Sequence, residues 1–412
     1  MPDSSREGAL SHIRVLDLSR ILAGPWAAQM LGDLGAEIIK VERPGVGDDT
    51  RGWGPPYVKD VNGNDTTDST YCLSANRNKK SVTIDFTRPE GQKLVRALAA
   101  RCDIVIENFK VDGLRKYGLD YESLSRMNPA LIYCSITGFG QTGPYATRAG
   151  YDFLIQGLGG LMSFTGRPDD EPGGGPMKVG VALTDIITGM YSATAILAAL
   201  TFRAETGIGQ YIDMALLDVQ VGVLSNQAMN YLHTGALPER MGNAHPNVVP
   251  YQDFHTNDGY VIIAVGNDTQ FARLAQALGK PEWASDPQFS TNAQRVINRG
   301  ILIDQMNEIT ATRRTDEWVA LLEDAGVPCG PINDLEHVFK DPQVVARRMQ
   351  ISMQHPKYGD VPLVANPMRL SETPVQYRSA PPALGEHTNE VLTGLLDIDS
   401  ERLSELRRDN IV

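Results

Sequence analysis

One carboxylate in the chain is placed where it could act as a nucleophile. An apolar run that begins at Val179 ends at Asp185, and a long helix is predicted over residues 185–204. An acid at such a position is most often a helix cap or a first-turn acid, because the helix N-terminus carries partial positive charge. The same geometry favours an ionised carboxylate, which is the form that nucleophilic catalysis requires. Asp185 is therefore a candidate for both roles.

Other patterns in the sequence give weak or negative signals. The seven histidines are scattered without a HExxH-type pair, and no GxSxG elbow occurs. The glycine clusters at 157–160 and 173–175 match neither a P-loop nor a GxGxxG motif between a strand and a helix, which disfavours a standard dinucleotide site. We expect buried, reduced thiols and no metal site, because no CxxC spacing links the cysteines, Cys72, Cys102, Cys134 and Cys329.

Basic residues gather at 77–80, at Arg43 and at 115–116. One explanation is solvated loop charge. The other is a phosphate-binding rim for a nucleotide ligand, because Arg and Lys are charge-assisted donors to phosphate.

Charge and composition restrict the classes of partner. The chain has 412 residues, with 38 basic and 50 acidic side chains and a formal net charge of −12. This balance disfavours nucleic acid and anionic membrane as partners. Residues 1–10 lack the apolar region of a signal peptide, and the apolar stretch 193–202 is too short to span a bilayer. We therefore expect a cytoplasmic protein.

The elements that would position these residues alternate along the chain. Strands are predicted at 13–18, 36–41, 81–86, 104–107 and 131–136, with helices after several of them, which is typical of a doubly wound, mostly parallel α/β sheet. From about 234 the pattern changes, and the turn signal at 255–259 predicts a hairpin within a smaller α+β domain. The predicted ranges are 1–205 for a large domain, 206–230 for a linker, 231–325 for the small domain, and 326–412 for a linker and a return to the large domain.

Several phrases together resemble the family III CoA-transferases, also called the CaiB/BaiF family. They include VLDLSRILAGPWAAQMLGDLGAEIIKVERPG within 15–53, ANRNKKSVTIDF (75–86), CDIVIENF (102–109), YCSITGFGQTGPY (133–145), GVALTDIITGMY (180–191), VPCGPIND (327–334) and LGEHTNEVL (384–392). They cover nearly the whole chain in the expected order. The resemblance implies a Rossmann-like large domain built from both chain ends, a smaller α+β domain, and an interlocked homodimer.

The resemblance also implies a mechanism and a set of site residues. Asp185 matches the catalytic aspartate, which attacks the thioester of an acyl-CoA and later carries CoA itself. CoA and acyl-CoA are substrates, and no permanently bound cofactor or metal is implied. The positions expected to line the CoA site are Arg43, Ile84, Asn108, Phe109, Lys116 and Tyr117.

The acid substrate is implied by finer features. Racemases of the superfamily carry a His where this chain has Tyr151, and a phenol is a poor base at neutral pH. Oxalate-specific formyl-CoA transferases carry Gln and Tyr where this chain has Leu22 and Phe139, although Tyr71 matches. The phrases ANRNKKS, YCSITG and RAGYD resemble the succinyl-CoA:glutarate type. We expect CoA transfer from succinyl-CoA to a C4–C6 dicarboxylate such as glutarate, malate or itaconate; a formyl-CoA/oxalate transferase and a racemase-type isomerase are the alternatives.

Overall fold

The computed structural model describes residues 8–412; residues 1–7, part of the segment considered for a signal peptide, lie outside the described residues. The chain forms two compact units. One comprises the residues up to 160 together with 179–226 and 343–412, and the other comprises 161–178 and 227–342. The predicted ranges placed 161–178 in the large domain. Here this segment belongs to the second unit, where Gly242 N–H donates to the carbonyl of Gly166 over 3.0 Å.

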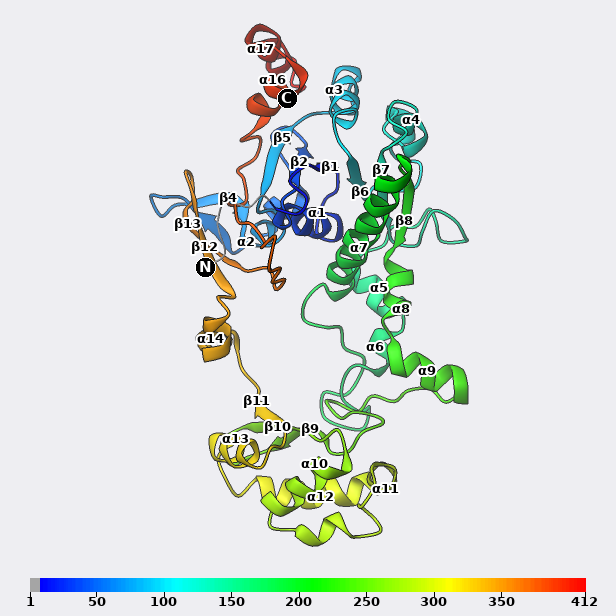
Figure 1. The fold of residues 1–412 in the computed structure, drawn as a ribbon, viewed down its shortest axis with the longest axis vertical. Coiled ribbons are helices and arrows are strands. Elements are labelled where there is room, and N and C mark those ends of the chain that lie inside the picture. Colours follow the sequence, from blue (N-terminus) through cyan, green and yellow to red (C-terminus); the bar gives the residue numbers. More distant parts are fainter. Residues whose placement is uncertain (1–7) are drawn as a thin grey trace. The chain divides into compact units, whose positions relative to one another are not determined.

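A six-stranded parallel sheet forms the centre of the first unit (Figure 1). Its strands lie in the order β5, β2, β1, β6, β7, β8, and every neighbouring pair is parallel. By chain position within this sheet the order is 3-2-1-4-5-6, as in the doubly wound dinucleotide-binding fold. The predicted α/β fold with a large parallel sheet is confirmed. The strands are β1 (Arg14–Asp17), β2 (Glu37–Glu42), β5 (Lys79–Thr83), β6 (Ile104–Glu107), β7 (Ile132–Thr137) and β8 (Tyr211–Ala215).

Helices bury both faces of this sheet. Successive strand residues point to opposite faces, so Val15 lies in one hydrophobic core and Leu16 in the other. Burial on both sides accounts for the apolar residues at the centres of β1, β2, β6 and β7, although buried charged residues such as Lys40 and Lys79 also lie in the sheet. The first core includes α1 (Ala23–Asp33), α5 (Asp152–Leu158), α7 (Leu183–Thr206) and α8 (Leu216–Gly222). The second includes α3 (Pro89–Ala99), α4 (Tyr121–Ser125), α16 (Thr388–Leu396) and α17 (Ser400–Arg408).

The C-terminal segment packs on the same unit through buried polar contacts. Arg51 donates to the carbonyl of Pro382 over 3.2 Å, and Asn366 donates to the Asp33 carboxylate over 2.9 Å. These contacts hold the C-terminal segment against the end of α1 and the loop after β2. The smaller elements here are the hairpins β3 (Tyr57–Lys59) with β4 (Asp65–Ser69) and β12 (Gln350–His355) with β13 (Gly359–Val364), and the short helix α2 (Thr70–Leu73).

The second unit is built around a three-stranded antiparallel sheet in the order β11, β10, β9. The predicted hairpin is confirmed, because His255 of β9 pairs with Tyr260 of β10. Its core contains Phe254, Phe271 and Trp318. The strands are β9 (Tyr251–His255), β10 (Tyr260–Ala264) and β11 (Cys329–Pro331); the helices are α6 (Leu161–Phe164), α10 (Asp268–Ala277), α11 (Asn292–Ile297), α12 (Arg299–Thr310), α13 (Thr315–Asp324) and α14 (Leu335–Lys340). Two further helices, α9 (Ser225–Thr234) and α15 (Pro342–Ala346), span the unit boundaries.

Helix α7 is 24 residues long and, by length and composition alone, is apolar enough to cross a membrane. One such helix is weak evidence, because core helices of soluble proteins pass the same test. Here α7 packs against α1, α8 and the neighbouring strands β7 and β8. Gly189 makes this approach possible, since a Cβ there would lie 2.7 Å from the carbonyl oxygen of Ala23.

Candidate active site

Asp185 lies in the first turn of α7, two residues after the helix begins at Leu183. The helix therefore starts slightly earlier than predicted, and the preceding segment is irregular rather than a strand. Asp185 does not cap the helix. No hydrogen bond to its carboxylate is found within residues 8–412, which leaves both oxygens available to a ligand.

The helix N-terminus is capped instead by a residue that the sequence analysis did not select. The Asp152 carboxylate accepts hydrogen bonds from the backbone N–H of Thr184, over 2.8 Å, and of Asp185, over 3.3 Å. Two buried glutamines complete the support. Gln156 donates to Asp152 over 2.7 Å, and Gln220 accepts from the Thr184 hydroxyl over 2.6 Å. The first turn of α7 is thus fixed from α5 and α8.

The electrostatic expectation for Asp185 was wrong. A helix N-terminus was expected to keep this carboxylate ionised, but burial and then the negative charge of Asp152 raise the pKa of Asp185 to about 7. Burial, together with the charges of Asp185 and Asp152, likewise raises the pKa of the half-buried Tyr71 to about 12. Asp185 thus has the basicity of a reactive group rather than that of a salt-bridged one.

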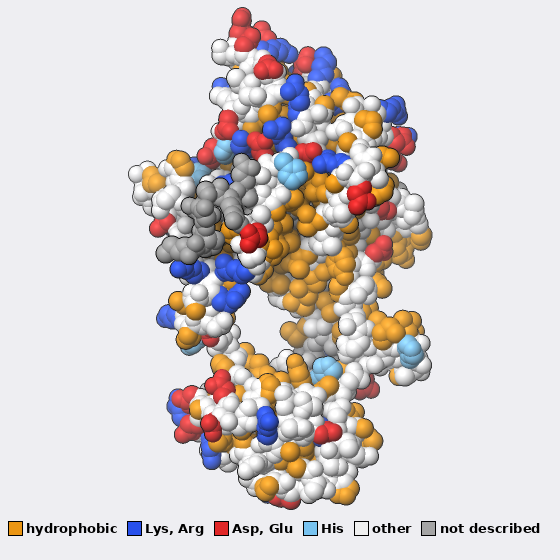
Figure 2. All heavy atoms as spheres, in the orientation of Figure 1, with side chains coloured by type: hydrophobic (Ala, Val, Ile, Leu, Met, Phe, Trp, Pro, Cys, Tyr) orange, Lys and Arg blue, Asp and Glu red, His pale blue; other side chains and the backbone are white. Residues whose placement is uncertain are grey.

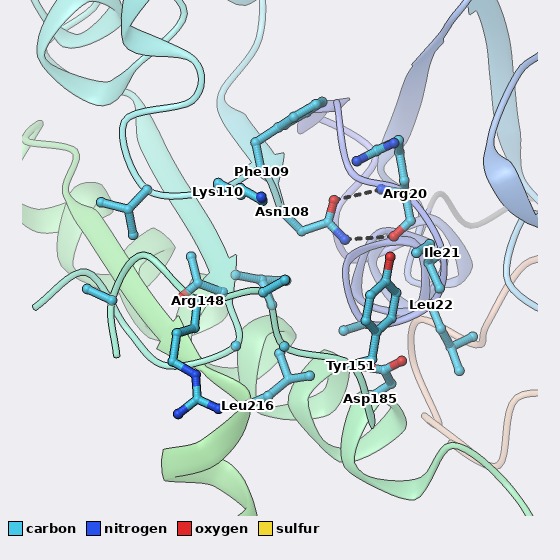
Figure 3. Close-up of a pocket in the computed structure, with 18 residues that line it drawn as sticks. Arg20, Ile21, Leu22, Asn108, Phe109, Lys110, Arg148, Tyr151, Asp185 and Leu216 are labelled. Atoms are coloured by element: carbon cyan, nitrogen blue, oxygen red, sulfur yellow. Dashed lines mark hydrogen bonds between the residues drawn. The ribbon is translucent and has the colours of Figure 1, made fainter. Parts of the chain in front are cut away.

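A cavity of 150 Å³ opens beside Asp185 (Figure 3). It is formed by the loop between β1 and α1, the loop after β6, the segment after β7, and the first turns of α7 and α8. Three cationic side chains line it: Arg20, Lys110 and Arg148. In Figure 3 Arg148 extends away from Asp185, and its guanidinium lies over the rings of Phe139 and Tyr145.

A larger cavity of 410 Å³ lies at the carboxyl ends of β1, β2 and β5. Its volume is within the range of cofactor pockets, and its position is where doubly wound sheets bind nucleotides. Arg20, Phe109 and Lys110 line both cavities. A ligand that occupies the larger cavity would therefore reach the smaller one past these shared residues.

The loop between β1 and α1 is held tightly at this junction. Asn108 accepts from the backbone N–H of Arg20 over 2.9 Å and donates to its carbonyl over 2.7 Å (Figure 3). Ile21 has φ = 70°, an uncommon conformation for a β-branched residue, and its N–H donates to Asp48. The buried Lys40 bonds Asp48 over 2.9 Å. A strained backbone conformation persists only where surrounding contacts impose it. The contacts of Asp48 with Ile21 and Lys40 impose it here, at the wall of the cavity.

The predicted residues fall into three groups. Asp185, Leu22, Asn108 and Tyr151 line the smaller cavity. The larger cavity is lined by Arg43, Ile84, Phe109, Lys116 and Tyr117. Tyr71 and Phe139 line neither; Tyr71 lies close enough to sense the charge of Asp185, and Phe139 is buried beneath Arg148.

The sequence reasoning missed Arg20, Ile21 and Lys110, which line the smaller cavity, and Asp152, which caps α7. Asp152 adjoins the selected Tyr151 in the phrase RAGYD. Its partner, however, lies on another helix, so no local pattern could have revealed the contact.

The basic cluster at 77–80 does not form a phosphate-binding rim. Its charged side chains instead make ion pairs, and Arg77 and Lys79 are buried, so the alternative of solvated charge is wrong for them as well. The pairs are Arg77 with Asp33, Lys79 with Asp17, and Lys80 with Glu37 and Glu390. Among residues 8–412 no group of three or more His, Cys, Asp or Glu side chains is arranged to hold a metal ion. Cys72, Cys102 and Cys134 are buried free thiols, as expected, and Cys329 is free and partly exposed.

The doubly wound sheet has a nucleotide-sized cavity at the carboxyl ends of its strands. Asp185, a carboxylate with a raised pKa, lies at the adjoining cavity. These features define an α/β enzyme site for a nucleotide-linked substrate. A sequence profile described as CoA-transferase family III matches residues 10–388. The chain belongs to this family and is a family III CoA-transferase.

Known relatives match over nearly their full length. The succinate–glutarate CoA-transferase of Agrobacterium fabrum is 51% identical over 96% of this chain and 98% of that protein. The human succinyl-CoA:glutarate CoA-transferase is 44% identical over 98% of this chain and 90% of that protein. A crystal structure of a CaiB/BaiF family protein from Brucella suis is 52% identical, covers 95% of this chain and 100% of that chain, and superposes with a TM-score of 0.83.

Proposed function

We propose that this enzyme transfers CoA from succinyl-CoA to glutarate or a similar C4–C6 dicarboxylate, with Asp185 as the covalent nucleophile. The observation that carries the proposal is the position of Asp185, a carboxylate with free oxygens at a cavity that adjoins the larger nucleotide-sized cavity. The named activities of the bacterial and human relatives support the choice of succinyl-CoA and glutarate.

The reaction proceeds through two kinds of acyl-enzyme. An oxygen of the Asp185 carboxylate attacks the thioester carbon, the C–S bond breaks, and CoA thiolate leaves a mixed anhydride behind. The thiolate then attacks the aspartyl carbonyl of the anhydride, which releases succinate and leaves CoA on Asp185 as a thioester. The acceptor carboxylate attacks this thioester, the C–S bond breaks, and CoA thiolate leaves a second mixed anhydride between Asp185 and the acceptor. The thiolate then attacks the acceptor acyl carbon, which forms the new CoA ester and expels the Asp185 carboxylate. The carboxylate of Asp185 is regenerated, with no net transfer of protons or electrons.

The residues that line the larger cavity form the proposed CoA site. Arg43 and Lys116 lie on exposed positions of its lining, where they can meet phosphate groups. Phe109 and Tyr117 each pack edge-on against Phe86, and together they present an apolar wall. Ile84 is buried at the lining of the same cavity. Lys110 and Arg20 line both cavities and carry positive charge on the side of Asp185. Their charge favours an anionic acid as the second substrate.

Asp185 attacks as the carboxylate, so its protonation sets the acid limb of activity. Because the pKa of Asp185 is raised to about 7, transfer should rise as pH increases through neutrality and level off above it. A carboxylate of this basicity is also a stronger nucleophile than an ordinary aspartate.

We further propose that the enzyme is an interlocked homodimer with the large domain formed by both ends of the chain, and that it acts in the cytoplasm. Hydrophobic side chains gather over the region where Figure 1 draws α1 and α7 (Figure 2). Met190, Tyr191 and Phe202 of α7 are each close to half exposed in the single chain, at 47, 49 and 46%. A second copy of the chain would cover such a surface. Light scattering of the purified protein should give twice the chain mass of 45.0 kDa; a monomer contradicts the proposal.

A panel of acceptor acids tests the proposed substrates. Succinyl-CoA is offered with glutarate, malate, itaconate, oxalate and carnitine, and the CoA esters formed are separated and quantified by mass spectrometry. We expect ester formation with one or more of the C4–C6 dicarboxylates. Activity only with oxalate or carnitine contradicts the substrate assignment. Exchange of α-deuterium in a branched acyl-CoA, without transfer, identifies an isomerase instead.

A further inference from the structure

A second carboxylate, Asp152, stands directly behind the proposed nucleophile and has no part in the transfer steps above. We propose that Asp152 is a positioning residue that holds the first turn of α7 and, through its negative charge, drives Asp185 toward its acylated, uncharged forms. This inference rests on the proposed function of Asp185 as the nucleophile and adds the group that makes it reactive.

Geometry places the two carboxylates on adjoining helix starts. Asp152 is the first residue of α5, and one of its oxygens, Oδ2, accepts both N–H donors from the first turn of α7. Its other oxygen, Oδ1, accepts from the side-chain amide of the buried Gln156. The side-chain oxygen Oε1 of Gln156 in turn accepts from Val179 N–H over 3.0 Å. Asp152 therefore bonds on both sides and has a fixed orientation. The backbone amide that it holds belongs to Asp185 itself.

The charges that face Asp185 come from several elements. Burial disfavours the ionised form of Asp185, and the negative charge of Asp152 on α5 adds to this effect. Tyr71 of α2 also faces the pair, and burial together with the two carboxylates raises its pKa to about 12, so it is uncharged at working pH. The cations Arg20, Lys110 and Arg148 line the cavity in front of Asp185. Of these, Arg20 is already paired with Asp49.

Repulsion between the two carboxylates has a chemical consequence. A proton or a succinyl group removes the negative charge when it bonds to an Asp185 oxygen, and CoA removes it when its sulfur bonds to the carboxyl carbon. Each of these therefore relieves the same repulsion from Asp152. The interaction that makes Asp185 hold a proton more tightly therefore also favours the anhydride and the aspartyl thioester. A purely structural cap would give no such coupling, because its hydrogen bonds to the backbone are equally present before and after acylation.

Neutral replacements of Asp152 separate these roles. Asp152→Asn and Asp152→Ser keep an oxygen that can accept from Thr184 N–H but lose the charge. The matched control is Asp218→Asn, which removes an exposed acid from the first turn of α8, outside both cavities. Circular dichroism and thermal unfolding select the variants that fold.

The titration of Asp185 is measured directly in each folded protein by ¹³Cγ-aspartate NMR, with Asp185→Asn used to assign the signal. We expect the midpoint to fall by roughly one pH unit in both neutral variants and to stay unchanged in Asp218→Asn. The occupancy of the succinyl-CoA-dependent covalent enzyme, trapped with hydroxylamine at pH 8, should fall about tenfold, because one pH unit corresponds to a tenfold change in equilibrium.

An unchanged midpoint in the neutral variants overturns the inference, whatever happens to the activity. A lower midpoint without any covalent enzyme in the parent protein means instead that the proposed function has failed while the electrostatic coupling is real. A uniform loss of transfer at all pH values, with no shift of the acid limb, reduces Asp152 to a structural cap and also refutes the inference.

Discussion

Two groups of acids that are wholly or partly buried in the same unit have opposite properties. At the ends of β1 and β2, Asp17 pairs with Lys79, Glu42 with Arg51, and Asp48 with Lys40. At the start of α7, Asp185 meets another acid and no paired cation within the described residues. Burial alone would raise the pKa of Asp48, but Lys40 and the Thr50 N–H lower it to about 2. Asp185 stands at about 7. The partner, rather than the residue type, therefore decides whether an aspartate is structural or reactive.

The largest effect should come from replacing Asp185, the reactive aspartate. Asp185→Asn preserves shape but cannot form the anhydride, so transfer should fall by about ten-thousand-fold or more, as is usual for the loss of a covalent nucleophile. The rate of glutaryl-CoA formation measures this loss. Substantial residual transfer would show that another group carries the acyl chain.

Replacing Asp48, the structural aspartate, should instead lower the stability of the fold. Asp48→Asn leaves Lys40, which is 1% exposed, without its ion-pair partner. Breaking a buried pair from one side costs about 3–5 kcal/mol, so the free energy of unfolding should fall by that amount in urea titrations. The Asp49→Asn variant, which alters an exposed pair with Arg20, is the matched control and should change stability by less than about 1 kcal/mol. Equal effects for the two variants would contradict the contrast drawn here.

The raised pKa of Asp185 also predicts how stability depends on pH. The unfolded aspartate has a pKa near the ordinary value of 3.8, and the folded one about 7, so the folded state binds this proton more tightly. The group therefore costs stability as pH rises from about 4 to 7, and the full cost is present above 7. Asp185→Asn removes that cost. It should be more stable than the parent at pH 8 by roughly 4 kcal/mol, because the pKa differs by about three units between the two states, with no gain at pH 4. Urea titrations at the two pH values measure the difference; a gain that does not depend on pH would argue against the raised pKa.

The smallest of these effects concerns the contact between α1 and α7. Gly189→Ala places a Cβ 2.7 Å from the Ala23 carbonyl and 3.0 Å from the Trp26 side chain, so the helices must separate. We expect a loss of about 1–3 kcal/mol in unfolding free energy and a lower kcat, because Ala23 and Asp185 line the same cavity. Gly394→Ala on α16, where a Cβ meets nothing within 4 Å, is the control and should be neutral or stabilising. A neutral Gly189→Ala would mean that the helices accommodate the methyl group.

Much of the frame could be predicted from local patterns, because buried parallel strands are apolar runs and the helices between them carry apolar periodicity. The same patterns placed Asp185 at a helix start. The residues after β2 and β6 were assigned to the CoA site by the family resemblance instead. The roles of the charged residues could not be predicted in this way. Arg77 and Lys79 resembled a phosphate site until their partners, Asp33 and Asp17, were seen to lie beside them in space.

The raised pKa of Asp185 could not be predicted for a related reason. Local sequence shows a helix N-terminus, which lowers a carboxyl pKa, whereas burial and Asp152 act through tertiary contacts and outweigh it. The cap of α7 was also missed, because Asp152 precedes the helix by more than 30 residues and belongs to α5.

Covalent trapping tests the central claim most directly. The enzyme is incubated with succinyl-CoA and hydroxylamine at pH 8, digested, and examined by mass spectrometry, with Asp185→Asn and Asp218→Asn treated in parallel. We expect a hydroxamate on Asp185 in the parent and in Asp218→Asn, formed only when succinyl-CoA is present, and none in Asp185→Asn. Active transfer with no modification of Asp185, or with modification of a different residue, would contradict this claim.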